Sequence, residues 1–381
     1  MRQVNIGYYS AKNYLDKNTF SGTLYHMYKA LSHQNINLIN LGNPRQPSLW
    51  TKPLKLVDKA SSLFKQKESD PNLFYEKFNH SVQKTLNKKP CDLIFAPVSS
   101  KELGFLETDI PIIYLSDATP KLIKQTYKIY GNEEEFLQAS QQEIVALKKA
   151  TKLVYSSKWA ANSALNDYDA DPSKIEIVPF GANVDTIPDA NETLKKCQIS
   201  KCHLLFIGKD WERKGGNIAY QTLLSLLDMG VDAELLMMGC TPPSEFQHKK
   251  LKVIPFLNKN ISKEQEQFSQ ILLNSHFLVF PTRADCSPIV ICEANAYGIP
   301  VITTDVGGIP TILKEGQNGY MLPPSAGGDE YAKQIATHFS NKQTYEQLVR
   351  SSRKEYDERL NWNKWAESMY KIMTDMIQQA G

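Results

Sequence analysis

The sequence has few cysteines, and their spacing supports neither a zinc site nor a disulfide framework. The chain of 381 residues contains six cysteines, none of them in a Cys-x-x-Cys pair or beside a pair of histidines at zinc-ligand spacing. Several lie inside apolar runs, where small buried residues are expected. The absence of a disulfide framework fits a reducing compartment, and no metal or cofactor is predicted.

The sequence also lacks a strong charge of either sign and a long apolar run. Lysine and arginine number 44 against 41 acidic residues, a formal net charge of +3, whereas a nucleic-acid-binding domain is usually clearly basic. No stretch approaches the roughly 20 apolar residues of a membrane-spanning helix. The first residues run directly into a strand-like segment, without the apolar core of a signal peptide. We therefore expect a cytoplasmic protein with no nucleic-acid partner.

Short apolar segments do occur, and they alternate with helical patterns along the whole chain. Near-continuous apolar runs of this length favour parallel strands that are covered on both faces, and the alternation predicts repeated βαβ units. The predicted class is α/β, with two doubly wound Rossmann-like domains that face each other across a cleft. The predicted strands are 4–10, 35–42, 91–97, 111–116, 152–156 and 175–180, then 203–209, 233–239, 251–257, 277–282, 301–304 and 320–323.

A polar connector between about residues 184 and 200 predicts the domain boundary. The first domain is expected to span 1–185 and the second 196–355. The last helix, about 361–381, has apolar residues at helical spacing and is expected to pack back on the first domain. Because ligands of doubly wound sheets bind at the carboxyl ends of the strands, the loops at those ends are the candidate site.

The loop after the first strand of the second domain is a candidate anion-binding site. Residues 208–216 read Gly-Lys-Asp-Trp-Glu-Arg-Lys-Gly-Gly and precede a helix. Two glycines at a helix start would let an anion approach backbone N–H groups, where the helix dipole adds positive charge. Lys209 and Lys214 would add two full charges. The loop is neither a Walker loop nor a Gly-x-Gly-x-x-Gly fingerprint, and a solvated surface turn is the alternative.

Two acidic residues follow the predicted strand 277–282. Asp285 lies in the loop at the strand end, and Glu293 lies one to two turns into the next helix, because Pro288 suits a first helical turn. Seven residues separate the two acids, which is too far for two metal ligands on one turn. The spacing suits two carboxylates that contact different parts of one elongated ligand.

These elements together resemble the retaining glycosyltransferases of family 4, the glycosyl transferases group 1, which have the GT-B fold. The family pairs two acids at this spacing with a Gly-x-Pro-Val-Ile continuation, here residues 298–302. Residues 208–215 resemble its lysine loop, 305–310 its next glycine loop, 177–185 its hinge strand, and 19–23 its small-residue loop. The likeness covers most of the chain and is strongest from about 175 to 325.

The resemblance implies a donor site in the second domain and an acceptor site in the first. Glu293 would bind the donor ribose, and Lys209 and Lys214 would hold the diphosphate, with Gly22 letting the first domain close over it. Asp285 would hold the transferred sugar, although the family usually has Glu there. Phe256 and Leu257 would contact the nucleobase, and core packing is the alternative for Phe256. The backbone of four further residues would also contact the donor: Ser287, Pro288, Ile289 and Val290.

The implied catalytic residues are Asp285, Lys214 and Asp117. Asp117 takes the place of a histidine common in the family, and the alternative is that it caps the following helix. Thr311 replaces a glutamate. The run 167–171, Asp-Tyr-Asp-Ala-Asp, mimics a metal-binding motif but is expected to be a solvated loop.

The implied activity is retaining transfer of a hexose from a nucleotide sugar, with UDP-glucose preferred, to a hydroxyl of a glycan, a lipid-linked sugar or a small metabolite. The lysines would stabilise the departing diphosphate, so no metal is required. A nucleotide-sugar epimerase, a phosphorylase and a two-domain binding protein are the alternatives.

The basic, apolar segment 51–67 is either a peripheral membrane contact or a solvated helix. Five tyrosines are either acceptor surfaces or core residues, namely Tyr8, Tyr9, Tyr14, Tyr25 and Tyr75.

Overall fold

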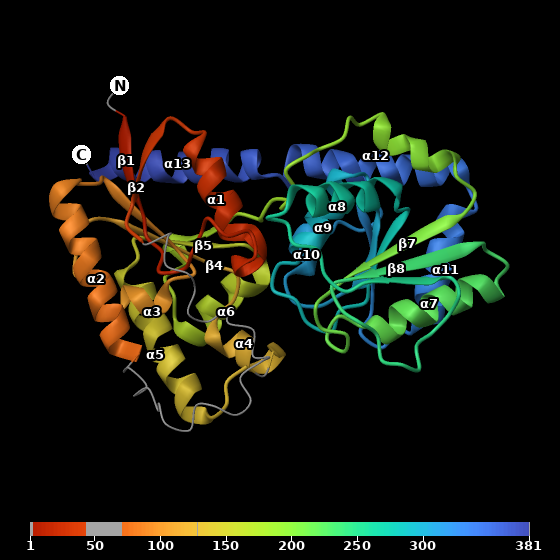
Figure 1. Ribbon diagram of the computed structural model, residues 1–381. Helices are drawn as coiled ribbons and strands as arrows, with labels where there is room; N and C mark the ends of the chain where they lie inside the picture. Colours follow the sequence, from red (N-terminus) through yellow and green to blue (C-terminus); the bar gives the residue numbers. More distant parts are fainter. Residues whose placement is uncertain (1–2, 43–70, 128, 381) are drawn as a thin grey trace, which may run out of the picture.

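The computed structural model describes residues 3–42, 71–127 and 129–380, and the strands in these ranges form two parallel six-stranded sheets (Figure 1). Every predicted strand segment contains a strand, and only β7 and β12 begin one residue earlier than predicted. The predicted doubly wound α/β class is thus confirmed. The strands are β1 (Val4–Tyr8), β2 (Ile36–Asn40), β3 (Leu93–Pro97), β4 (Ile112–Ser116), β5 (Lys152–Tyr155), β6 (Ile175–Ile177), β7 (Cys202–Ile207), β8 (Ala233–Met238), β9 (Leu251–Ile254), β10 (Phe277–Phe280), β11 (Val301–Thr304) and β12 (Gly319–Leu322).

Helices make most of the connections, because parallel neighbours require a crossover, but no helix lies between β8 and β9. The central strands β3, β4, β10 and β11 are buried at every position, as expected when helices cover both faces. The α-helices are α1 (Thr23–Ser32), α2 (Pro71–Lys88), α3 (Ser100–Leu103), α4 (Pro120–Tyr127), α5 (Glu133–Lys149), α6 (Lys158–Tyr168), α7 (Gly216–Asp228), α8 (Ser262–Asn274), α9 (Ile289–Ala296), α10 (Ile309–Ile312), α11 (Gly328–Phe339), α12 (Lys342–Glu358) and α13 (Trp362–Ala380). Three 3₁₀ turns are η1 (Thr19–Gly22), η2 (Pro172–Lys174) and η3 (Glu192–Gln198).

The order of the strands places a switch point inside each sheet. The first sheet runs β2-β1-β3-β4-β5-β6, and the second runs β12-β11-β10-β7-β8-β9. The direction of winding therefore reverses between β1 and β3 and between β7 and β10. Ligands of open α/β sheets bind outside the carboxyl ends of the strands at such points.

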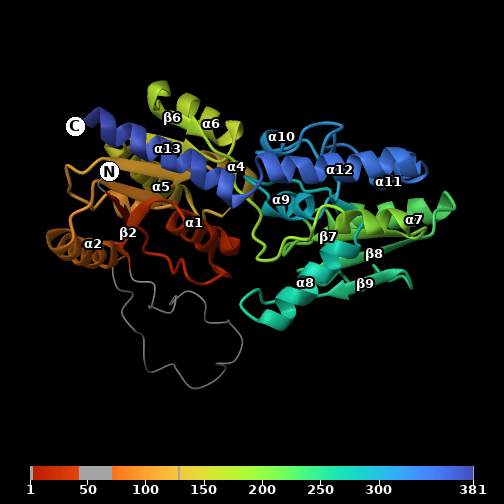
Figure 2. The same cartoon turned by 90° about the horizontal axis from the view of Figure 1, so that it is seen from above.

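The last helix covers the first sheet although it follows the second sheet in sequence (Figures 1 and 2). Trp365, Met369 and Met373 of α13 join the core around β1 and α1. The two stretches of chain that cross between the sheets are also in contact, because the backbone N–H of Ala182 donates to Leu360 O at 3.1 Å. A change in the angle between the sheets would therefore move both of these connecting segments.

Several sequence alternatives are decided by burial. Tyr8 and Tyr9 are 0% exposed and Tyr14 is 1% exposed, so these rings are core residues and cannot serve as acceptor surfaces. The run 167–171 is a loop only in part, because Asp167 and Tyr168 are the last two residues of α6 and Ala170 is buried. Asp167 pairs with Lys121, and the carboxylate of Asp171 accepts from the N–H of Ser173. The segment 51–67 lies outside the described residues. Within those residues, no helix combines the length and apolarity that a membrane crossing requires.

Candidate active site

A cavity of about 360 Å³ lies where the carboxyl ends of the two sheets meet. Its walls come from the loops after β1 and β4 of the first sheet and from those after β7, β8, β9 and β10 of the second. Gly22 does not line this cavity but a smaller adjoining one, of about 10 Å³. The other predicted site residues all line the main cavity: Asp117, Lys209, Lys214, Phe256, Leu257, Asp285, Ser287, Pro288, Ile289, Val290 and Glu293.

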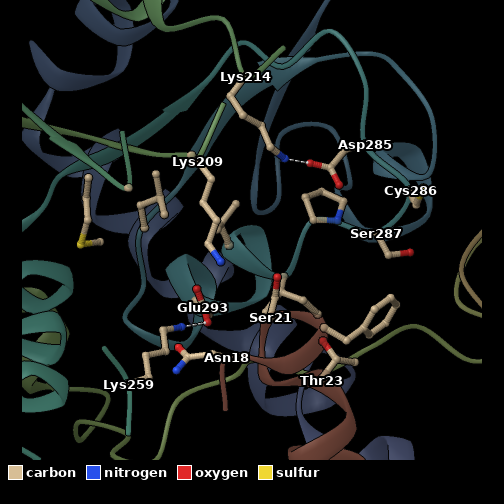
Figure 3. A pocket seen from close by; sticks show the side chains of 18 of the residues that line it. Asn18, Ser21, Thr23, Lys209, Lys214, Lys259, Asp285, Cys286, Ser287 and Glu293 are labelled. Carbon is tan, nitrogen blue, oxygen red and sulfur yellow. Dashed lines mark hydrogen bonds and ion pairs between the residues drawn. The ribbon is translucent and has the colours of Figure 1, made fainter. Parts of the chain in front are cut away.

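The two predicted lysines extend from one loop into the cavity but differ in their surroundings (Figure 3). Lys214 is largely buried, forms an ion pair with Asp285, and places its ammonium 4.8 Å from the centre of the Phe280 ring. Lys209 is exposed and forms no ion pair with any residue that the structure describes. Lys209 is thus the cation that an incoming anion meets without displacing an internal partner.

The glycines of this loop serve a different purpose from the predicted one. Gly215 has φ +73°, and a Cβ there would lie 2.1 Å from Pro281 O, while a Cβ on Gly216 would lie 2.3 Å from the Trp211 ring. The N–H of Gly215 donates to Glu212 O and that of Gly216 to Trp211 O. The expectation that these glycines open the start of α7 to an anion is therefore wrong. They are required by close packing, and their N–H groups are already bonded.

The start of α9 supplies the backbone donors that the start of α7 does not. Pro288 is the N-cap of α9 rather than a residue of its first turn, a shift of one position from the prediction. The N–H groups of Ser287, Ile289 and Val290 have no acceptor among the described residues and belong to residues that line the cavity. The orphan N–H groups and dipole at a helix N-terminus favour a polar or anionic ligand.

The loop before α9 is held from the first sheet. The hydroxyl of Tyr127, the last residue of α4, accepts from the N–H of Cys286 at 3.0 Å. The hydroxyls of Ser156 and Ser287 lie 2.6 Å apart and are buried. Sequence reasoning missed these contacts because 159 and 131 residues separate the partners.

Glu293 lies on the cavity wall, on α9, and is paired with a residue that the sequence motifs did not indicate. Its side chain is 3% exposed, and Oε1 lies 2.5 Å from Nζ of Lys259 (Figure 3). Lys259 follows β9 in the same loop as Phe256 and Leu257. Its place after a strand end was the one sequence signal that could have pointed to it.

Phe256 and Asp117 each had a structural alternative, and neither alternative holds. Phe256 is 53% exposed, so it is not a core residue. The hydroxyl of Thr119, rather than Asp117, accepts from the N–H of Leu122 at the start of α4, at 3.4 Å. Burial raises the pKa of the Asp117 carboxyl from 3.8 to about 6, and the Asp285 carboxylate adds to the shift against the opposing Lys12 ammonium.

A comparison with known proteins identifies the second half of the chain. Residues 201–341 match the family model described as Glycosyl transferases group 1. The matched residues carry the lysine loop, the acidic pair and the start of α9, so the second-sheet wall of the cavity is largely the part of the chain that is similar to this family.

Individual relatives are distant. The D-inositol 3-phosphate glycosyltransferase of Corynebacterium kroppenstedtii is 23% identical over 245 residues, which are 58% of this chain and about half (54%) of that protein. Spore coat protein SA of Bacillus subtilis is 27% identical over 249 residues, 60% of this chain and 66% of that protein. The matched part of the chain therefore spans only about half the length of some of its curated relatives.

Solved structures share the fold over nearly the whole chain. Sucrose-phosphate synthase from Thermosynechococcus elongatus superposes with a TM-score of 0.70 at 14% identity, covering 99% of this chain and 100% of that one. Anabaena Alr3699/HepE in complex with UDP-glucose gives 0.61 at 13% identity, covering 98% and 100%. The two sheets and their helices have the GT-B arrangement.

One residue that departs from the pattern of that family lies between the two halves of the molecule. Thr311, in the place of a glutamate, accepts from the backbone N–H of Lys158 at 3.0 Å, at the start of α6 in the other half of the molecule. Thr311 does not line the cavity. Its hydroxyl joins the two halves.

A metal would have few ligands here. Within the described ranges, no group of three or more His, Cys, Asp or Glu side chains is arranged to hold a metal ion. Positive charge at the cavity is supplied by side chains instead, namely Lys17, Lys209, Arg213, Lys214 and Lys259.

Proposed function

We propose that this chain is a retaining glycosyltransferase that moves a hexose from a nucleotide sugar to a hydroxyl acceptor. The observation that carries the proposal is the convergence of Lys209, Lys214, Asp285 and Glu293 with the start of α9 on one cavity. These groups can bind a diphosphate, a sugar and a ribose at the same time. The similarity of residues 201–341 to the glycosyl transferases group 1 family supports the reaction class.

In this proposal the second domain, 196–355, binds the donor and the first, 1–185, binds the acceptor. Glu293 accepts from the ribose hydroxyls, and the nucleobase lies against Phe256 and Leu257. Asp285 and the free N–H groups at the start of α9 hold the transferred hexose. UDP-glucose is the preferred donor, consistent with the UDP-glucose complex of the similarly folded Alr3699/HepE.

Catalysis then rests on stabilising the negative charge that develops on the departing diphosphate. Lys209 and Lys214 supply fixed positive charge at the cavity, and no metal is needed for that purpose. Asp117 lies on the opposite wall, after β4, where the acceptor enters. In a retaining reaction the acceptor attacks on the face that the diphosphate leaves, and a leaving-group oxygen takes the acceptor proton.

Release of a nucleoside diphosphate tests this proposal directly. Purified protein is incubated with UDP-, GDP- and ADP-sugars and a mixture of glycan, lipid-linked and small-molecule hydroxyl acceptors. We expect one base to be released in step with a glycosylated product whose anomeric configuration matches the donor. An epimerase would convert the donor sugar without release, and a binding protein would release nothing. Either outcome, or an inverted product, contradicts the proposal.

A further inference from the structure

Lys259 is the one cation of the cavity that is paired with the proposed ribose-binding carboxylate. Nζ lies 2.5 Å from Glu293 Oε1, and the two side chains are 24% and 3% exposed. A carboxylate this deeply buried is costly unless it is paired. Lys259 therefore provides the charge that allows Glu293 to occupy the wall of the cavity.

The ammonium of Lys259 is held in a fixed position from several sides. It donates to the backbone oxygen of Asn183, on the crossing between the sheets, at 3.3 Å, and it lies 4.2 Å from the centre of the Phe268 ring on α8. Most lysines keep the charged head of the side chain in water. Three partners from three elements make Lys259 a rigid group instead.

This fixed ammonium sets the rotation of the Glu293 carboxylate. Oε1 faces Lys259, and Oε2 accepts no hydrogen bond from the described residues, while the side chain lines the main cavity (Figure 3). A group that recognises two neighbouring hydroxyls must be held close to its productive geometry by the residues around it. Lys259 is the residue placed to do so.

We propose that Lys259 is a positioning residue that sets donor specificity: it orients Glu293 so that the site recognises ribose and rejects 2′-deoxyribose. The inference rests on the proposed role of Glu293 in binding the ribose hydroxyls. It adds a specificity determinant, from the loop after β9, that acts through the carboxylate rather than on the nucleotide itself.

The test is the ratio of two affinities in each variant. UDP, GDP and ADP and their 2′-deoxy forms are titrated calorimetrically into wild type, Lys259→Met, Lys259→Arg and Lys263→Met. Lys259→Met removes the charge and keeps the apolar stem, while Lys263 is an exposed lysine in the first turn of α8 without an ion pair among the described residues. If Lys259→Met does not fold, Lys259→Gln makes the same comparison.

For the base that binds best, we expect wild type and Lys263→Met to prefer the ribonucleotide by at least about tenfold, the value of one hydrogen bond to a charged group. Lys259→Met should lower this ratio below about threefold, and Lys259→Arg should restore most of it. An unchanged ratio in Lys259→Met overturns the inference and leaves the role of Glu293 standing. Loss of both forms of the nucleotide in Lys259→Met also overturns it, because Lys259 would then contact the diphosphate directly. A wild type that does not discriminate, or binds no nucleotide, refutes the proposed ribose site itself.

Discussion

At the scale of single residues, four charged groups of the cavity form two ion pairs, whereas Lys209 has no such partner among the described residues. Lys214 pairs with Asp285 and Lys259 pairs with Glu293, and 71 and 34 residues separate the partners. The sequence indicated three of these four residues, because each lies in a recognisable local pattern. It could not indicate the pairs, since a contact between distant loops leaves no local pattern.

Replacing Lys209 and replacing Lys214 should have similar effects on turnover but different effects on the stability of the protein. Replacing either by Met should lower turnover by about 10²- to 10³-fold, the usual cost of losing one contact to a developing charge. Only Lys214→Met should lower the free energy of unfolding, by about 1–3 kcal/mol, because Asp285 is left buried without its partner. Denaturant titration and initial rates measure both effects.

The double variant Lys214→Met/Asp285→Asn is the control for the stability effect. Because it removes the unpaired carboxylate as well, it should be more stable than Lys214→Met alone. If both single lysine variants turn over at the wild-type rate, Lys209 and Lys214 do not stabilise the departing diphosphate.

Asp117 is predicted to give the stability of the protein a pH dependence. Its pKa is raised from 3.8 to about 6 in the folded state, chiefly by burial, so between about pH 4 and 6 the native carboxyl keeps a proton that the unfolded chain has lost. Wild type should therefore lose stability relative to Asp117→Asn as pH rises through this window, by at most about 1.4 kcal/mol per pH unit. A difference between the two proteins that stays flat from pH 4 to 7 would show that the carboxyl is not shifted.

At the scale of elements, the positions of the strands could be predicted from the sequence, but the structural roles of the loop glycines could not. The central strands β3, β4, β10 and β11 are short runs whose burial on both faces shows in the sequence itself. The glycines at the start of α7 were located correctly but assigned the wrong purpose. Glycine is required there because Pro281 and the Trp211 ring pack directly against the two Cα positions. Such close packing between distant residues cannot be seen in the sequence.

Gly215→Ala and Gly230→Ala separate these two reasons for a glycine. Both residues have positive φ, +73° and +79°, but a Cβ on Gly230 meets nothing within 4 Å, whereas a Cβ on Gly215 meets Pro281 O at 2.1 Å. Gly230→Ala should cost only the backbone term, about 1 kcal/mol. Gly215→Ala should cost a further 1–3 kcal/mol or so for overpacking, measured by denaturant unfolding. Equal costs would contradict the packing explanation.

At the scale of the whole molecule, the site exists only where the two halves meet. The contacts of Tyr127 with Cys286, of Ser156 with Ser287 and of Lys158 with Thr311 hold the segments after β10 and β11 of the second half against the first. The resemblance predicted two facing domains and a cleft. It did not predict these contacts, because they depend on how the two sheets are oriented.

Tyr127→Phe tests whether the contact across the halves matters for transfer. The variant keeps the ring below Arg213 and removes the hydroxyl that accepts from Cys286 N–H. Loss of the hydroxyl's two contacts, with the N–H and with Sγ of Cys286, should lower kcat/KM for the donor by up to about tenfold with little change in unfolding temperature. Tyr130→Phe is the matched control, since the Tyr130 hydroxyl makes no hydrogen bond among the described residues. Equal rates in the two variants would show that the contact is dispensable.

The central claim, that this cavity binds a nucleotide sugar through its lysine loop, is tested most directly by thermal unfolding with UDP, GDP, ADP and their sugars. A nucleotide at 100 times its Kd should stabilise the wild type by about 2.7 kcal/mol. We predict such stabilisation for one base in the wild type and its loss in the Lys209→Met/Lys214→Met double variant. Absence of stabilisation by every nucleotide, or equal stabilisation of the double variant, would contradict the account.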